Sequence, residues 1–186
     1  DPNQQLVSAY TQRPGDGLAV QRFEQWYKGI KVAHGSFSVA AKNGIITYAH
    51  GNIFRPSTEL STAAALTESQ ALQKALDFIN AQDYMWQNPK QEKMLREIMK
   101  DPNATYFPKG TMVWVEDFNS TARNKQLHLA YCFNIYAEAP LSRNLVYIDA
   151  NTGNVLLKDP VIKHITATGK SLYSGNVSFE TDMSGS

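Results

Sequence analysis

One stretch of this chain, residues 22–52, limits the possible folds more than any other. It reads as consecutive antiparallel strands, because large side chains such as Gln25 and Tyr27 alternate with their neighbours at the period of two that a strand shows. Lys28-Gly29 then allows a chain reversal, and a second apolar run follows. The stretch therefore predicts a small antiparallel meander.

The dipeptide Asn43-Gly44 is the strongest local signal in the sequence. Asn and Gly accept positive φ at both central positions of a type I′ turn, so the pair predicts a tight hairpin between strands at residues 37–40 and 45–48. Gly35, in the preceding strand, predicts a bulge or a close approach of another part of the chain.

Composition places the chain among ordinary globular proteins. Of its 186 residues, 42% are hydrophobic and 19% are charged, so there is enough apolar material to bury a core. The net charge of +1 gives no reason to expect a nucleic acid or a membrane surface as a partner. Neither a leader sequence nor a run of the ~18 apolar residues that a membrane helix needs is recognised.

Few residues of this sequence suit catalysis or metal binding. The single cysteine, Cys132, excludes an internal disulfide and a four-cysteine zinc cluster, and it is interpreted as a small core residue rather than a reactive thiol. The sequence has neither His-Glu-x-x-His nor Gly-x-Ser-x-Gly, so the chain is predicted to be non-catalytic. Four histidines occur without another His or Cys at metal-ligand spacing: His34, His50, His128 and His164.

Two helices are predicted. The first starts at a capping box, with Thr67 as N-cap and Gln70 three residues later. The second starts at Asn88-Pro89, since proline suits the first turn of a helix. Each helix carries apolar residues at helical spacing that are expected to face a core, namely Ala71, Leu72, Ala75, Leu76, Phe78 and Ile79 in the first and Met94, Leu95, Ile98 and Met99 in the second.

The remaining apolar runs read as strands. The candidates are residues 111–115, 127–137 and 144–148, and the second of them alternates over its whole length. Residues 149–153 form a predicted turn into a last strand at 155–157. The predicted fold class is therefore α+β, with antiparallel sheets packed against helices.

The first region resembles the pro-region of secreted thermolysin-like zinc metalloproteases, in its fungalysin/thermolysin-propeptide module. The resemblance rests on the aromatic-rich strand and Gly-Ile-x-Val turn at residues 22–32, on Gly35, on Asn43-Gly44 and on Gly51-Asn52. The family usually has proline where Lys31 stands, which affects the turn only. The motif residues implied by the resemblance are Gln25, Tyr27, Gly29, Val32 and Gly44.

The second region resembles the PepSY module, which follows the first module in the same pro-regions. The helix start at residues 66–72 and the closing hairpin at 145–156 carry this resemblance, with Asp149 and Gly153 as motif residues. The insertion at residues 83–110 is similar to that of Bacteroidetes-type members. The resemblance implies two small cystatin-like/PepSY modules at residues 1–58 and 59–160, and a cleavage linker with the start of a catalytic domain at residues 161–186.

The resemblance also implies a function. It is that of a propeptide, acting as intramolecular chaperone and inhibitor of its cognate thermolysin-like zinc metalloprotease. The implied partner is the catalytic domain of that protease, and zinc, with calcium as an option, would belong to that domain, so no cofactor is expected in this segment. The implied location is secreted, periplasmic or at the cell surface.

A second interpretation stays open, namely a free-standing cystatin-like/PepSY module that inhibits or binds another protein. Such a module would end near Leu157, whereas a pro-region continues into a protease, as residues 166–178 do by resemblance. Trp26, Tyr27 and Phe37 are expected to fill the core of the first module rather than to form a binding surface.

The bond between His164 and Ile165 is the predicted processing site. It lies in a predicted linker that follows Pro160, and chains are cut where the backbone is exposed and weakly hydrogen-bonded. By resemblance, a thermolysin-like enzyme prefers a bulky aliphatic residue such as Ile165 after the scissile bond. The alternative is a cut near Lys158, with Ile165 as a strand residue of the catalytic domain.

Overall fold

The computed structural model describes residues 2–56, 59–121, 126–171 and 175–183, and describes side chains as far as Ile162. The first four strands form the meander, which comprises β1 (Gln4–Gly15), β2 (Leu18–Tyr27), β3 (Ile30–Lys42) and β4 (Ile45–Asn52). The second half adds α1 (Glu68–Ile79), β5 (Asp83–Tyr84), a 3₁₀ turn (Met85–Gln87), α2 (Pro89–Met99), β6 (Thr111–Glu116), β7 (Leu127–Ala139), β8 (Ser142–Asp149) and β9 (Val155–Pro160). A hairpin of β10 (Lys163–Ser171) and β11 (Gly175–Met183) follows.

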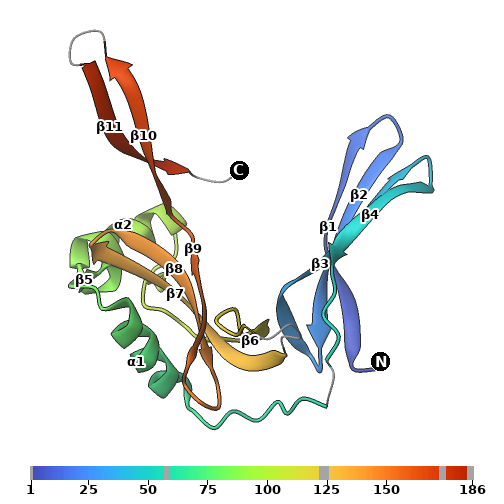
Figure 1. The fold of residues 1–186 in the computed structure, drawn as a ribbon, viewed down its shortest axis with the longest axis horizontal. Coiled ribbons are helices and arrows are strands. Elements are labelled where there is room, and N and C mark those ends of the chain that lie inside the picture. Colours follow the sequence, from blue (N-terminus) through green and yellow to red (C-terminus); the bar gives the residue numbers. More distant parts are fainter. Residues whose placement is uncertain (1, 57–58, 122–125, 172–174, 184–186) are drawn as a thin grey trace.

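One mixed sheet runs through both halves of the chain (Figure 1). Its order in the described part of the chain is β1-β2-β3-β6-β7-β8-β9, with β4 beside β3 and β5 beside β7. The β3–β6 step is parallel and is made by one residue pair, Val32 with Trp114, whereas the other paired strands are antiparallel. With its helices, this sheet gives the predicted α+β class.

The hairpin turns of the meander are those predicted from the sequence. Lys28 and Gly29 have φ values of 48° and 74°, and Asn43 and Gly44 have 50° and 81°. Positive φ at both central positions is the type I′ geometry, which matches the twist of the flanking strands. The order of β2, β3 and β4 therefore follows from these two local signals.

The middle of β3 carries a large bulge next to Gln25. The pairing of β2 with β3 stops at Glu24–Ser36 and resumes at Trp26–Lys31. Gly35 lies in this bulge, and a Cβ atom there would come within 2.8 Å of the Gln25 Oε1 atom. The predicted close approach at Gly35 is confirmed, and the bulge releases β3 to pair with β6.

Helix α1 covers one face of the β7–β8 pair (Figure 1). The predicted capping box is present, since the Thr67 hydroxyl accepts the Gln70 amide and the Gln70 side chain accepts the Thr67 amide. Ala71 and Ala75 are fully buried against β7 and β8, in a cluster with Leu72, Leu76, Ile79, Phe133, Ile135, Val146 and Ile148. Phe78 was expected on this face but is 48% exposed, because the buried surface of the last turn is supplied by Ile79 instead.

Helix α2 starts as predicted, but three of the four residues of its apolar stripe do not face a core, and the fourth, Leu95, is half-buried. Asn88 caps the helix through the Lys90 amide, yet Met94, Ile98 and Met99 are all exposed. The buried residue is Glu92, whose carboxylate accepts the Tyr106 amide at 2.7 Å. The core assignment was wrong because helical spacing shows which residues share a face and not whether another element covers it.

The β10–β11 hairpin projects from the end of β9 (Figure 1). Its two strands pair with each other from Lys163–Met183 to Ser171–Gly175 and form a separate two-stranded sheet in the described part of the chain. Residues 163–171 are thus a strand, where an open linker was expected. Residues 172–174 and 184–186 lie outside the described residues, as do Ser57 and Thr58 at the predicted module boundary.

Candidate functional site

The meander and the β6–β9 part of the sheet meet at a junction, and Gln25 is one of its buried residues. This side chain is fully buried, and its Nε2 donates to the Phe54 carbonyl at 2.6 Å. The Phe54 amide donates back to Gln25 Oε1 at 2.9 Å. The side-chain amide of Gln25 therefore bonds to the backbone after β4 in the way that a neighbouring strand would. These bonds determine where the chain leaves the meander.

Tyr27, Val32 and Trp114 form the core of the junction. The Trp114 indole Nε1 donates to the Tyr27 carbonyl at 2.9 Å, and the two rings meet edge to face with centroids 5.9 Å apart. Val32 is fully buried, and Trp114 is 1% exposed. Leu127, Leu129 and Ala150 complete this cluster. Three of the predicted motif residues, Gln25, Tyr27 and Val32, are thus brought together.

An open cleft of about 480 Å³ lies at the same junction. We call it the junction cleft, and its lining comes from both halves of the chain: His34, Asn52, Phe54, Glu116, Phe118, Leu157 and Asp159. The His34 ring packs edge to face on Phe118 at 5.8 Å, from a backbone with φ of 61°. Positive φ is uncommon for a residue with a side chain and marks positions worth inspection for function.

The chemistry of the junction cleft suits docking rather than bond making. Aromatic rings and Leu157 give it apolar walls, and Glu116 and Asp159 supply carboxylates. Within the residues that the structure describes, no group of three or more His, Cys, Asp or Glu side chains is placed to hold a metal ion. Likewise, none of the described helices is long and apolar enough to cross a membrane.

Asp149 organises the turn between β8 and β9, on which the entry to α1 is held. Its Oδ1 accepts the Asn151 and Thr152 amides, each at 2.8 Å, and His128 Nδ1 donates to its Oδ2 at 2.9 Å. Burial raises the pKa of this carboxyl, but these hydrogen bonds outweigh burial and hold the pKa below its usual value. The Ala150 carbonyl in this turn accepts the Ala65 and Leu66 amides, so the turn positions the helix entry.

The other predicted site residues have conformational roles or lie apart from the junction. Gly153 has a φ of 77° in the turn after β8, and its amide donates to the Asp149 carbonyl. Gly29 and Gly44 occupy hairpin turns. In β10, His164 pairs with Asp182 and Ile165 with Thr181, while the side chains there lie outside the described residues. The predicted cut between them stays a prediction.

Cys132 lies on β7 directly opposite Tyr147 of β8 and is partly buried. Burial raises the pKa of its thiol to about 11, so the reactive thiolate is scarce at neutral pH.

The junction cleft could not be predicted from the sequence. His34 carries no local signal for positive φ, and the contacts of Phe118 and Asp159 depend on non-local strand pairing. The contact between Trp114 and Tyr27 could not be predicted either, since the two residues lie 87 positions apart in the chain. The Gly35 signal and the predicted motif residues Gln25, Tyr27 and Val32 lie at this junction, but none of them indicates a cleft.

The first four strands carry a recognised protease propeptide motif. Residues 4–53, from β1 to the end of β4, match the Fungalysin/Thermolysin Propeptide Motif. Among solved structures, the chain is similar to the Bacillus megaterium YpeB C-terminal domain, with 14% identity and a TM-score of 0.40. That alignment covers 83% of this chain and 56% of the other, so the chain spans little more than half of that structure. No curated protein matches.

Proposed function

We propose that this chain is the pro-region of a thermolysin-like zinc metalloprotease and acts as intramolecular chaperone and inhibitor of the catalytic domain. The observation that carries the proposal is the propeptide motif at residues 4–53. Its residues Gln25, Tyr27 and Val32 build the junction that holds the meander on the rest of the sheet. These motif residues therefore have a structural role, and we expect a partner to bind the exposed surfaces around them.

The exposed strands of the meander support a docking role. All eight residues of β4 are exposed, and Ile45, Ile46 and Tyr48 are 72%, 66% and 61% exposed. In the described part of the chain, β4 pairs with β3 alone. A long exposed edge with apolar side chains is a template on which another chain can add strands. A protease domain with many non-local contacts would fold faster on such a template.

The proposal includes the rest of the predicted arrangement. Residues 59–160 form a PepSY module of cystatin-like fold, residues 161–186 lead into the catalytic domain, and the precursor is secreted, periplasmic or at the cell surface. Zinc, with calcium as an option, belongs to the catalytic domain.

Refolding of the denatured mature protease, with and without this chain in trans, tests the function. The expected result is a higher yield of active enzyme with the chain present during refolding, and slow-release inhibition of the native enzyme at micromolar concentration. A chain that does neither would overturn the proposal. The reading frame beyond Ser186 separates the proposal from a free-standing module, because a pro-region requires a His-Glu-x-x-His downstream.

The processing bond has a separate test. Ile165→Asp should slow maturation of the precursor, because a thermolysin-like enzyme, by the family resemblance, disfavours a charged residue after the scissile bond. Thr168→Asp, in the same strand, serves as the matched control, and N-terminal sequencing of the mature enzyme gives the cut. A first residue before Val161 or after Gly169 would contradict the assignment.

A further inference from the structure

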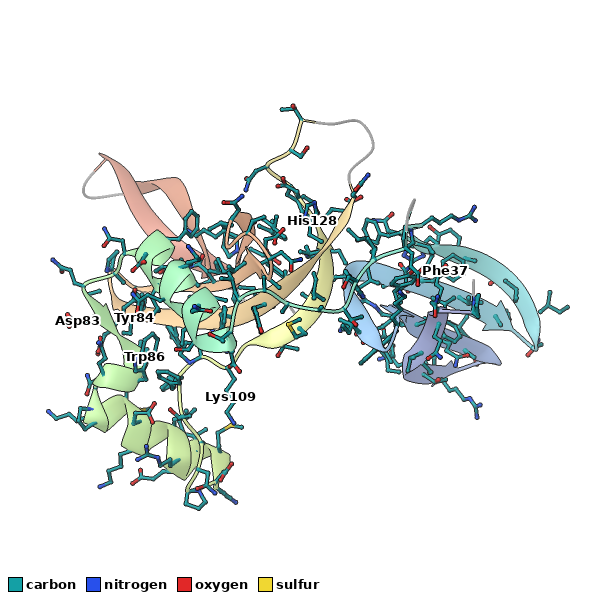
Figure 2. All side chains as sticks on the ribbon, turned by 90° about the horizontal axis from the view of Figure 1, so that it is seen from below. Phe37, Asp83, Tyr84, Trp86, Lys109 and His128 are labelled. Atoms are coloured by element: carbon teal, nitrogen blue, oxygen red, sulfur yellow. The ribbon has the colours of Figure 1, made fainter. Side chains whose placement is uncertain are left out.

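A second, smaller cavity of about 140 Å³ lies away from the junction, beside the half of β7 that β6 does not reach. Residues 105–109 line one side, and Asn134, Tyr136 and Arg143 line the other. Figure 2 shows Lys109 on the segment between α2 and β6, below the sheet and away from Phe37 of the meander. We call this cavity the Lys109–Arg143 pocket.

Arg143 is held in a fixed position in this pocket. Its Nε donates to Asn134 Oδ1 at 3.0 Å, and its guanidinium carbon lies 5.4 Å from the centroid of the Tyr136 ring. The Tyr136 ring is itself held edge to face by Tyr106 at 5.5 Å. A guanidinium stacked on an aromatic ring and bonded through Nε loses little further freedom when its two terminal amino groups bind an oxyanion.

The carboxylate of Glu92 borders the pocket, since it accepts from the lining residues Thr105 and Tyr106, but it is paired with Arg96. None of the lining residues is Asp or Glu, and within the described residues neither Lys109 nor Arg143 makes an ion pair. The carboxylate of Glu138 lies farther along β7, where it accepts from the Asn88 side chain at 2.9 Å and 3.2 Å. Two cations therefore share a small cavity with tyrosine walls, in a chain whose net charge is only +1.

We propose that the Lys109–Arg143 pocket binds a carboxylate. The terminal amino groups of Arg143 form the planar fork that matches two carboxylate oxygens, and Lys109 adds a second positive charge. The pocket is large enough for a carboxylate. The carboxylate comes either from an acidic side chain of a bound protein or from a free small acid. This inference is independent of the proposed function.

Titration of the full chain, followed by amide and Arg Nε–H NMR signals, tests the proposal. The probes are acetate and N-acetylglutamate amide, and N-acetylglutamine amide is the uncharged isostere. Both acids should give saturable shifts at Asn134, Tyr136 and Arg143, whereas the isostere should give none. Tighter binding of the glutamate probe than of acetate would assign the pocket to an acidic side chain, and equal binding would assign it to a free acid.

Variants make the test specific. Arg143→Gln should weaken binding of the glutamate probe about tenfold or more. The reason is that a charge-assisted pair of hydrogen bonds stabilises the complex more than a single hydrogen bond from a neutral group does. Arg143→Lys keeps the charge without the fork and should also weaken binding, and Lys109→Gln on the exposed loop should do so without affecting folding. Lys158→Gln, an exposed cation of β9, is the control and should bind as the wild type does.

Three results would overturn the proposal. The first is the absence of saturable shifts in the wild type. The second is equal binding by the wild type, Arg143→Gln and Lys109→Gln. The third is tighter binding of sulfate than of acetate, which would assign the pocket to tetrahedral anions instead.

Discussion

Two hydrogen bonds join the side-chain amide of Gln25 to the backbone of Phe54, in a region that excludes water from Gln25 altogether. The side chain satisfies both backbone groups of a residue that has just left a strand. Removing it would leave the Phe54 amide without its acceptor, whereas the Phe54 carbonyl would keep a longer contact with the Gln4 side chain at 3.3 Å. An unpaired polar group at such a site costs more than a lost surface hydrogen bond.

Gln25→Leu should therefore lower the free energy of unfolding by about 1–3 kcal/mol, because that is the cost of leaving the Phe54 amide unpaired. Urea denaturation measures this value. Gln21→Leu in the same strand is the matched control, since its side chain makes one exposed hydrogen bond to Ser8, and a change within about 0.5 kcal/mol is expected. Equal effects of the two substitutions would show that the Phe54 contacts contribute nothing.

Asp149 should make the stability of the chain sensitive to acid. Its pKa is lowered in the folded state, so the folded chain binds a proton less readily than the unfolded chain does. The stabilisation is complete above the unfolded pKa of about 4 and is lost as pH falls through the lower folded value. Unfolding free energies of the wild type and Asp149→Asn should thus converge below about pH 4.

The control for this pH series is Asp77→Asn, because Asp77 accepts only from the exposed Gln73 side chain. Its stability curve should run parallel to that of the wild type. A constant gap between the wild type and Asp149→Asn from neutral pH to acid would contradict the role given to the Asp149 carboxylate.

At the scale of elements, α2 and the segment after it form an arm that is held by a buried carboxylate. Glu92 accepts the Tyr106 amide, the Thr105 hydroxyl at 3.2 Å and Arg96 Nη2 at 2.8 Å. Met94, Ile98 and Met99 of the helix meanwhile face solvent, and Leu95 is half-buried. The attachment of this element is therefore polar, although its sequence reads as an amphipathic helix.

Glu92→Ala should cost about 2–3 kcal/mol of stability, because it removes hydrogen bonds to a charged group and leaves the Tyr106 amide without its acceptor. The double substitution Met94→Gln and Ile98→Gln should change stability by less than about 0.5 kcal/mol, as exposed positions do. Urea denaturation and far-ultraviolet circular dichroism follow both. A larger loss of stability in the double variant would show that Met94 and Ile98 are part of a core.

The elements that could be predicted are those specified by neighbouring residues. Asn43-Gly44 determines its own turn, and Thr67 and Gln70 determine their own cap. The stripe of α2 could not be placed, because whether Ile98 is covered depends on parts of the chain far from the helix. The Lys109–Arg143 pocket was missed for the same reason, since its two cations come from separate elements.

For the whole molecule, the junction joins two sheet regions through one parallel residue pair and one shared cluster. Val32 and Trp114 supply the pair, and Trp114 also donates to the Tyr27 carbonyl. The class of fold followed from the strand and helix patterns. This connection did not, because no periodicity in β3 specifies a partner strand that begins at Thr111.

Trp114→Ala should cost about 3–5 kcal/mol, as large-to-small substitutions of buried aromatics do. Hydrogen exchange should show reduced protection in β2–β3 and in β6–β7 together, because both pack on this side chain. Trp86→Ala is the control, since Trp86 packs on Tyr84 and Phe107 at the other end of the sheet, and protection of β2–β3 should be unchanged. Loss confined to β6–β7 would show that the two regions are not coupled.

The contacts of the segment between β4 and α1 determine which part of the chain can fold first during synthesis on the ribosome. The meander has its hairpin partners once residue 54 emerges, and the Gln25 contacts to Phe54 can close at once. The entry to α1 has to wait, because the Ala65 amide binds the Ala150 carbonyl and the Asn151 side chain, 86 positions downstream. During synthesis, the propeptide motif is therefore complete, with its β4 edge exposed, while the helix that follows still lacks its sheet.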